Sequence, residues 1–218
     1  IKQAAYDELG YFDDNFHLGV NWYRSLFPTK FVQKKTEAEF KKFLTYDVTP
    51  FYIYNPLVVD RIFKFSPNAK IIAVLRNPID RAYSNYNNKI QEEGDTKTTF
   101  EEVVYSEIEK IESNENNQKN NAFLVDEFYE LLLARGFYSK QLEYWFKKFP
   151  RNNMLLISSE ELAVNTDKIV SKIFEFLEVP DQKINDLTKQ NKIKYPKMKD
   201  STREILINFF KPHNEKLF

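Results

Sequence analysis

Short runs of consecutive apolar residues alternate along the chain with longer segments in which apolar residues recur every three or four positions. The two clearest runs are residues 70–75 (KIIAVL) and 154–158 (MLLIS), and residues 43–48 form a less regular third one. Runs of this length, rich in β-branched residues, predict buried, parallel strands. The periodic segments predict helices. The pattern therefore indicates an α/β fold, with a central, mainly parallel sheet flanked by helices.

Capping residues locate most of the predicted helices. Capped starts are expected at Asn55-Pro56, at Asn77-Pro78, at the Thr99/Glu102 and Ser201/Glu204 capping boxes, and at Asn165. The first two helices should run to about residues 65 and 91. Two further helices are predicted over residues 123–135, where Gly136 is a stop signal, and over residues 138–149.

The composition indicates one folded domain over residues 1–218 and excludes several kinds of site. The chain holds 32 basic and 32 acidic side chains, with 42% hydrophobic and 16% aromatic residues. A neutral chain has no overall field to attract nucleic acid or a membrane surface, so any anion site must be local. The absence of cysteine excludes disulfides and thiol catalysis, and with two histidines a His-rich metal site is excluded too.

No run of 18 apolar residues is present, so no membrane segment is predicted. The N-terminal residues lack the basic and apolar regions of a secretory signal. Together with the absence of cysteine, these features favour a cytoplasmic location. The chain begins at Ile1 without an initiating Met, which indicates a processed or fragmentary start.

The most informative stretch is residues 73–86 (AVLRNPIDRAYSNY), which reads as a strand, a sharp Asn-Pro turn and a helix. Such a turn presents backbone N–H groups and the positive end of the helix at the carboxyl edge of a sheet, where anions bind readily. Arg76 ends the strand, and Ser84 lies on the helix, so both can reach one anion. From these residues alone, a structural junction whose arginine pairs with a carboxylate is an equal alternative.

The spacing Arg76-x-Pro78-x-x-Arg81-x-x-Ser84 resembles the 3′-phosphate-binding signature of sulfotransferases that depend on 3′-phosphoadenosine 5′-phosphosulfate (PAPS). The resemblance implies a P-loop-NTPase-like sulfotransferase fold, PAPS as donor, adenosine 3′,5′-bisphosphate (PAP) as product, and no metal. It implies that Arg76 and Ser84 bind the 3′-phosphate and that Arg81 forms a structural salt bridge. Further segments along the chain also resemble glycan sulfotransferases. They are residues 10–13, 19–28, 46–52, 136–150, 158–162, 174–180, 194–198 and 209–217.

Residues 46–52 (YDVTPFY) resemble the catalytic segment of the glycan enzymes, Glu-Lys-Ser/Thr-Pro-x-Tyr. The resemblance places Asp47 where the family has its catalytic Glu and implies that Asp47 takes the acceptor's proton as general base. Val48 replaces the family's Lys, which removes a cation and weakens the likeness to the heparan-type enzymes. The alternative is that Asp47 only caps the turn before Thr49-Pro50.

Residues 191–195 (NKIKY) resemble the C-terminal cofactor loop of the glycan enzymes, although the glycine of that loop is missing. The resemblance implies that Lys192, Lys194 and Tyr195 contact the cofactor. Solvated surface lysines are the alternative interpretation of Lys192 and Lys194.

The family's 5′-phosphosulfate loop, a strand followed by a Lys-x-Gly-Thr/Ser-Thr/Ser turn and a helix, has no counterpart in the chain. Its four glycines, Gly10, Gly19, Gly94 and Gly136, all lie in other contexts. We therefore expect the first strand and this loop to precede Ile1 in the natural protein, and the missing strand to leave a sheet edge exposed.

Three functions are compatible with these features. The first is sulfuryl transfer from PAPS to a hydroxyl or amine of a carbohydrate. The second is the same reaction on a lipid, a polyketide or another small-molecule alcohol. The third is a degenerate sulfotransferase fold that binds a nucleotide or glycan without turnover, which the missing loop favours. A nucleotide kinase is disfavoured because the chain has no GxxxxGK[ST] motif.

Overall fold

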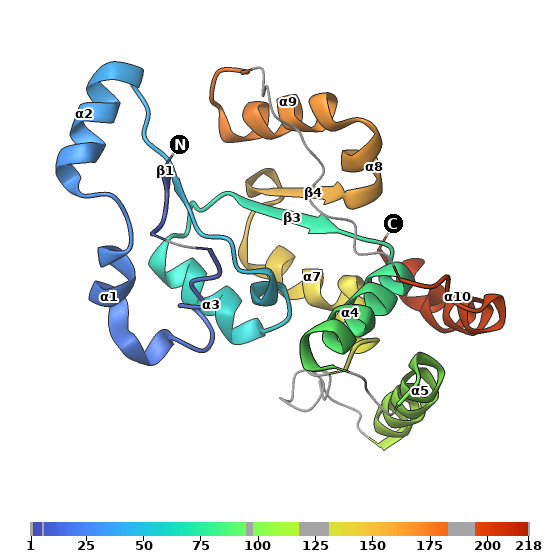
Figure 1. Ribbon diagram of the computed structural model, residues 1–218. Coiled ribbons are helices and arrows are strands. Elements are labelled where there is room, and N and C mark those ends of the chain that lie inside the picture. The colour runs from blue at the N-terminus through green and yellow to red at the C-terminus, as the bar shows by residue number, and fades with distance from the viewer. Residues whose placement is uncertain (1, 6, 95–97, 118–130, 183–194, 218) are drawn as a thin grey trace.

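The computed structural model describes residues 2–5, 7–94, 98–117, 131–182 and 195–217. Its strands form parallel pairs (Figure 1): β1 (Lys2–Gln3) with β2 (Thr45–Tyr46), and β3 (Ile71–Leu75) with β4 (Met154–Ser158). The α/β class and the parallel pairing are confirmed. The described strands nevertheless form two separate pairs rather than one sheet, because β2 pairs with β1 and not with β3.

Strand β3 is less buried than its apolar sequence predicts. Ile72 is 37% exposed and Val74 is 51% exposed, whereas the alternate residues of β3 are partly buried. β4 pairs with one edge of β3, and no strand in the described part of the chain pairs with its other edge. The prediction of a fully buried strand is wrong for these residues, since side chains that alternate across a strand are all buried only when both faces are covered.

Helices lie on both sides of the β3–β4 pair. They are α1 (Gly19–Ser25), α2 (Lys30–Phe40), α3 (Pro56–Phe65), α4 (Pro78–Glu93), α5 (Phe100–Asn117), α7 (Tyr138–Lys148), α8 (Ser159–Val164), α9 (Thr166–Leu177) and α10 (Asp200–Asn214). Short 3-10 turns are η1 (Phe16–Leu18), η2 (Pro50–Ile53), η4 (Ala134–Gly136) and η5 (Arg151–Asn153). α8 and α9 lie on one side of the strand pair, and α3 and α7 on the other (Figure 1). None of the helices described is long and apolar enough to span a bilayer.

Three of the predicted caps are confirmed. The Asn55 side chain accepts a hydrogen bond from the Leu57 N–H at 2.9 Å, and the Asn77 side chain accepts from the Ile79 N–H at 3.0 Å. The capping box before α5 is also present. Glu102 accepts from the Thr99 N–H at 2.7 Å, and Thr99 Oγ1 accepts from the Glu102 N–H at 3.3 Å.

The other two predicted caps are borne out only in part or not at all. Asn165 is the N-cap residue of α9, as predicted, and its carbonyl accepts from the Ile169 N–H at 3.0 Å, but its side chain makes no capping hydrogen bond. α10 begins at Asp200, so Ser201 lies inside the helix rather than capping it. A carboxylate in the first turn interacts favourably with the helix dipole, which accounts for the earlier start.

The helix predicted to end before Gly136 is replaced, over its described residues 131–135, by a turn and η4. The buried carboxylate of Glu107 on α5 accepts the N–H groups of Leu132 at 2.9 Å and Leu133 at 2.8 Å. Glu107 thus supplies acceptors that a preceding helical turn would otherwise provide. Residues 123–130 lie outside the described residues.

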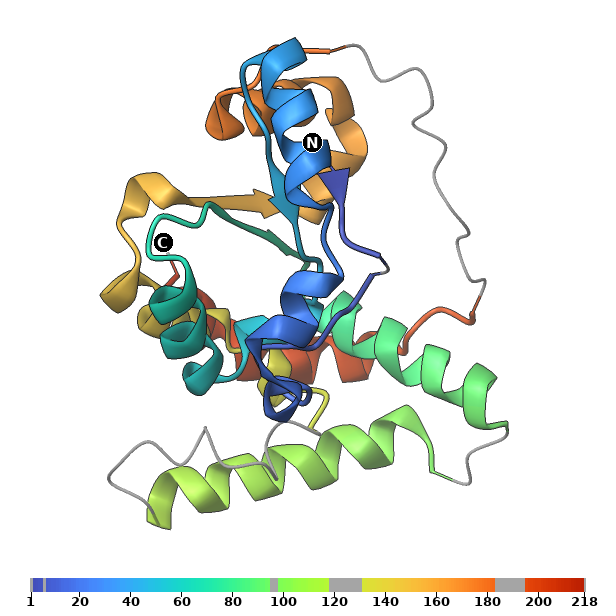
Figure 2. The same cartoon turned by 90° about the vertical axis from the view of Figure 1, so that its left-hand side faces the viewer.

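Two hydrophobic clusters determine where the functional residues lie. One joins α4, α5, η4 and α10 through residues such as Ala82, Val104, Phe137 and Phe210. The other joins the N-terminal segment to α1, η2, α3 and α7 through Tyr11, Phe12, Tyr23, Tyr52, Val58 and Trp145. Figure 2 shows α4, α5 and α10 below the strand pair, with α2 on the far side of the molecule from α5. The first cluster supports α4 and η4, and the second supports η2.

Candidate functional site

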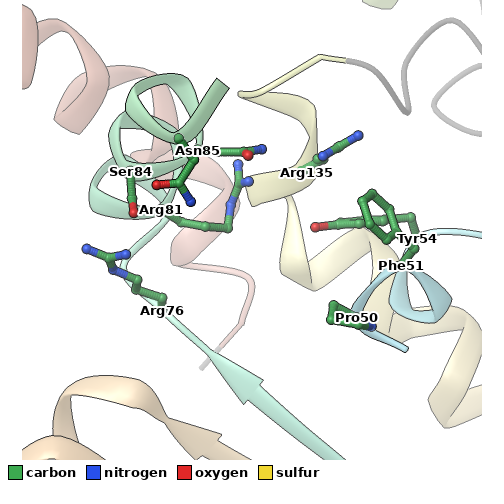
Figure 3. Close-up of a pocket in the computed structure, with 9 residues that line it drawn as sticks. Pro50, Phe51, Tyr54, Arg76, Arg81, Ser84, Asn85 and Arg135 are labelled. Atoms are coloured by element: carbon green, nitrogen blue, oxygen red, sulfur yellow. The ribbon is translucent and has the colours of Figure 1, made fainter. Parts of the chain in front are cut away.

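A cavity of about 290 Å³ lies between η2, the junction of β3 with α4, and η4 (Figure 3). Its lining residues are Pro50, Phe51, Tyr54, Arg76, Arg81, Ser84, Asn85, Asn88 and Arg135. Three of these side chains are guanidinium groups and none is a carboxylate. In a chain with no net charge, this lining makes the cavity a local site of positive potential.

Arg76 and Ser84 both line this cavity. Arg76 follows the last residue of β3, and Asn77 turns the chain into α4, whose second turn carries Ser84. In Figure 3 the two side chains occupy the same side of the cavity. The arrangement offers an anion one charged planar donor and one hydroxyl donor.

The backbone N–H groups at this turn are already engaged, contrary to the expectation that they would face an anion. The Asn77 side chain accepts from the Ile79 and Asp80 N–H groups, and Glu160 Oε1 accepts from the Asn77 N–H at 2.8 Å. Side chains, rather than the start of α4, therefore provide the donors of the cavity.

Arg81 and Tyr138 hydrogen-bond at the junction between β3 and α4. The Arg81 guanidinium donates to the backbone carbonyl of Leu132, rather than to a carboxylate as expected of a salt-bridge residue. The Tyr138 hydroxyl interacts with both the Arg76 backbone N–H and the Arg81 side chain. Burial raises the pKa of Tyr138, and the Arg81 charge and these two hydrogen bonds oppose the rise.

Asp47 follows β2 and is not among the residues that line the cavity. Its Oδ2 accepts from the hydroxyls of Tyr23 at 3.1 Å and Tyr52 at 3.0 Å, and its Oδ1 accepts from Thr49 Oγ1 at 2.9 Å. Burial raises the pKa of Asp47, although the three hydrogen bonds favour the carboxylate and oppose the shift. Asp47 thus makes the turn contact with Thr49 and also has the raised pKa that suits a proton acceptor.

A contact of the Glu8 backbone with the residue after Asp47 was not predicted from the sequence. Glu8 is exposed, and its backbone N–H donates to the Val48 carbonyl at 2.7 Å. Its φ of 54° lies in the left-handed region, which is uncommon for a residue with a Cβ atom and is found preferentially at functional sites. Nothing in a polar segment of sequence marks such a conformation in advance.

Arg135 also lines the cavity, but no sequence motif marks it as a site residue. Its guanidinium carbon lies 4.9 Å from the centre of the Phe51 ring and 5.7 Å from that of Tyr54. These rings belong to η2 and the residue after it, so the arginine connects η4 to the segment that follows Asp47. The sequence could not indicate this contact, because Arg135 and Phe51 are far apart in the chain and belong to different predicted elements.

The C-terminal cofactor-loop residues are only partly described. Tyr195 packs edge-on against Tyr83 of α4, with ring centres 5.4 Å apart, and the Tyr83 hydroxyl donates to the Pro196 carbonyl at 2.9 Å. This segment therefore docks on α4 at Tyr83, although Tyr195 is not among the residues that line the cavity. Lys192 and Lys194 lie outside the described residues.

Known proteins similar to this chain are sulfotransferases. The family model described as a sulfotransferase domain matches residues 25–216. The membrane-associated sulfotransferase kil1 of Dictyostelium discoideum is 25% identical, over 100% of this chain and 59% of that protein. The bifunctional heparan sulfate N-deacetylase/N-sulfotransferase 1 of Xenopus laevis is 25% identical, over 99% of this chain and 26% of that protein.

A further curated relative is a glycan sulfotransferase, and a solved structure is similar in fold. The heparan sulfate glucosamine 3-O-sulfotransferase 3B1 of Mus musculus is 28% identical, over 80% of this chain and 39% of that protein. The chain thus spans 26% to 59% of the three curated relatives. The crystal structure of a sulfotransferase from Alicyclobacillus acidocaldarius superimposes with a TM-score of 0.69 at 23% identity, covering 99% of this chain and 83% of that one. This likeness confirms the expected fold.

Proposed function

The chain belongs to the PAPS-dependent sulfotransferase domain family, and on this premise we propose that it transfers a sulfuryl group from PAPS to a hydroxyl or amine of a carbohydrate. Family membership supports the class of reaction. The observation that carries the choice of donor is that Arg76 and Ser84 line one cavity. The heparan sulfate enzymes among the relatives support a carbohydrate acceptor rather than a lipid, a polyketide or another small alcohol.

Arg76 and Ser84 bind the 3′-phosphate of the nucleotide in this proposal. A phosphate monoester carries nearly two negative charges at neutral pH, and a guanidinium with a hydroxyl satisfies several of its oxygens. Each hydrogen bond to a charged group contributes about 1.5–3 kcal/mol. The cavity therefore distinguishes nucleotides with a 3′-phosphate from those without one. Tyr195, Lys192 and Lys194 are assigned to the same nucleotide by resemblance to the cofactor loop.

Asp47 acts as the general base in this proposal. PAPS supplies the sulfuryl group, and the acceptor oxygen or nitrogen that takes the group must lose one proton. Asp47 receives that proton, for which its burial is favourable because a raised pKa makes a carboxylate a better proton acceptor. Tyr23 and Tyr52 hold the carboxylate in one orientation through their hydroxyls.

Calorimetry tests the nucleotide assignment directly. The chain should bind PAP more tightly than adenosine 5′-phosphate, and Arg76→Ala should weaken PAP binding about 10- to 100-fold while leaving adenosine 5′-phosphate binding unchanged. Arg151→Ala is a matched control, since Arg151 stacks on Phe146 at 3.8 Å and does not line the cavity. An equal loss for both nucleotides would show that Arg76 does not read the 3′-phosphate.

Turnover distinguishes an enzyme from a binding module. Transfer of labelled sulfate from PAPS to a panel of oligosaccharides, lipids and small alcohols should be measured on the protein with its natural N-terminal sequence. Transfer to oligosaccharides supports the proposal. Tight PAP binding without transfer to any acceptor in the panel would favour the degenerate binding module instead.

A further inference from the structure

Arg76 leaves the backbone at the point where two parallel strands end together. The register of the β3–β4 pair places Leu75 opposite Ser158, so each strand leads into a helix directly beyond the same edge of the pair. Arg76 and Asn77 form the turn after β3, and α8 begins at Ser159. Side chains of α8 can therefore reach the backbone that carries the Arg76 guanidinium.

Glu160, in the first turn of α8, holds one N–H group beside Arg76. Its Oε1 accepts from the Asn77 N–H at 2.8 Å, and its Oε2 accepts from the Ser158 hydroxyl at 2.8 Å. Ser158 also caps α8, because its Oγ accepts from the Glu161 N–H at 3.3 Å. The two oxygens of one carboxylate thus join the turn after β3 to the turn after β4.

Tyr138, in the first turn of α7, holds the N–H group of Arg76 itself. Its side chain is buried, and its hydroxyl accepts from the Arg76 N–H and also contacts the Arg81 side chain. The start of α7 packs tightly against α4, since a Cβ atom added to Gly136 would stand 2.8 Å from the Pro78 Cβ. The N–H groups of Arg76 and of the residue after it are therefore engaged by side chains from helices on opposite sides of the strand pair (Figure 1).

We propose that Glu160 and Tyr138 are positioning residues for nucleotide binding, and that they act through Arg76 by fixing the backbone from which its side chain extends. Neither residue lines the cavity. This inference rests on the proposed function, because it requires Arg76 to bind the 3′-phosphate. A guanidinium on a fixed backbone loses less conformational freedom when it binds a phosphate, so a held Arg76 binds more tightly than a mobile one.

Glu160 is negatively charged, so its charge and its hydrogen bond should act on a bound phosphate in opposite directions. Burial opposes ionisation of Glu160, but the hydrogen bonds from Asn77 and Ser158 prevail and hold its pKa below the ordinary 4.5. A negative charge near a phosphate repels it, so a purely electrostatic role predicts that removal of the charge tightens PAP binding. A positioning role predicts weaker binding when the hydrogen-bond acceptor is removed as well.

Calorimetry with PAP separates these two effects in Glu160 variants. Glu160→Ala should weaken PAP binding about three- to tenfold, because the Asn77 N–H loses its acceptor. Glu160→Gln, which keeps a carbonyl acceptor at the same distance from the backbone and loses the charge, should bind PAP at least as tightly as the wild type. Glu161→Ala is the matched control, since it removes a neighbouring exposed carboxylate, and it should not weaken binding. Unchanged or tighter PAP binding in Glu160→Ala, or an equal loss in Glu160→Gln, overturns the proposal for this residue.

Tyr138→Phe removes the hydroxyl and keeps the ring, so it tests the other contact with little change in packing. PAP binding should weaken about three- to tenfold, whereas binding of adenosine 5′-phosphate should not weaken in this variant or in Glu160→Ala. Tyr144→Phe, at another tyrosine of α7, is the matched control and should bind both nucleotides as the wild type does. Unchanged PAP binding in Tyr138→Phe, or equal losses for the two nucleotides, would contradict a role through Arg76.

Combination with Arg76→Ala shows whether the two residues act through Arg76. Once the guanidinium is absent, Glu160→Ala and Tyr138→Phe should cause no further loss of PAP affinity, whereas independent contributions would add. Additive losses therefore overturn the inference and leave the nucleotide assignment intact. If Arg76→Ala itself leaves PAP binding unchanged, the proposed function fails instead. Thermal melting identifies any variant that does not fold, and the exposed Glu160 keeps the test open if Tyr138→Phe is unstable.

Discussion

Arg76 and Ser84 are eight positions apart in the sequence, yet both line one cavity. The cause is the sharp turn at Asn77 and Pro78, where a strand ends and α4 begins at once. Ser84 lies almost two helical turns into α4, on the side that faces the end of the strand. A functional role for the pair therefore depends on the start of α4 as much as on the two side chains.

Ser84→Ala should weaken PAP binding roughly tenfold, because one hydroxyl donor to a charged phosphate is lost. Binding of adenosine 5′-phosphate should not change, since that ligand has no 3′-phosphate. Calorimetry on the chain measures both affinities. Ser201→Ala is the matched control, because Ser201 is an exposed serine within α10. Unaltered PAP binding in Ser84→Ala would remove the hydroxyl from the site.

Asp47→Asn should lower kcat about 10²- to 10⁴-fold and leave PAP affinity nearly unchanged, since general-base catalysis typically contributes that much. The amide keeps the size of the side chain but cannot take a proton. Glu8→Gln is the informative comparison, because the backbone of the exposed Glu8 pairs with Val48, the residue after Asp47, and is left-handed. If Glu8→Gln loses turnover and Asp47→Asn does not, Glu8 is the base and Asp47 is a turn residue.

The acid limb of kcat/KM should lie above pH 3.8, because burial raises the pKa of Asp47 above that ordinary value. Activity falls as the pH drops through the raised pKa, since the base becomes protonated. Tyr52→Phe should move the limb to still higher pH, because a hydrogen bond that favours the carboxylate is lost. Tyr46→Phe, at an exposed tyrosine of β2, should leave the limb in place. An acid limb at the same pH in Tyr52→Phe as in the wild type would argue against Asp47 as the titrating group.

The junction that carries Arg76 and Ser84 could be predicted because its signals are local. An apolar β-branched run, an Asn-Pro pair and a helical spacing of polar residues occur within residues 71–86 and require no distant partner. Helix α4 accordingly starts where the sequence predicts, with Asn77 as its cap. The burial of β3 could not be predicted in the same way, because it depends on which other segments cover Ile72 and Val74.

The Arg135 side of the cavity was missed because it is built by long-range contacts. Residues 131–135 follow a helix-like sequence pattern, but Glu107 binds the Leu132 and Leu133 N–H groups from another helix. A carboxylate 25 residues earlier leaves no mark on the local periodicity. The hydrogen bond of Tyr23 to Asp47 joins residues 24 positions apart in the same manner.

Glu107→Gln should lower the free energy of unfolding by about 1–3 kcal/mol, because one of the two N–H groups bound by this carboxylate loses its acceptor and faces an amide NH₂ instead. Denaturant unfolding measures the change. Glu109→Gln, at an exposed residue of the same helix, is the control and should change stability by less than about 0.5 kcal/mol. Similar losses in the two variants would mean that the Glu107 carboxylate does not hold the Leu132–Leu133 backbone.

The difference in stability between the wild type and Glu107→Gln should also depend on pH, in a direction set by the pKa of Glu107. Burial raises the pKa of Glu107 above its ordinary 4.5, while the two N–H groups and the charges of Lys110 and Arg81 oppose the rise. The native state therefore holds the proton more tightly than the unfolded chain does, and the cost of the buried charge is relieved as the pH falls through the raised pKa towards 4.5. Glu107→Gln has no such proton. The stability advantage of the wild type over the variant should thus increase between neutral pH and pH 4.5, and a constant or shrinking difference would contradict the assignment.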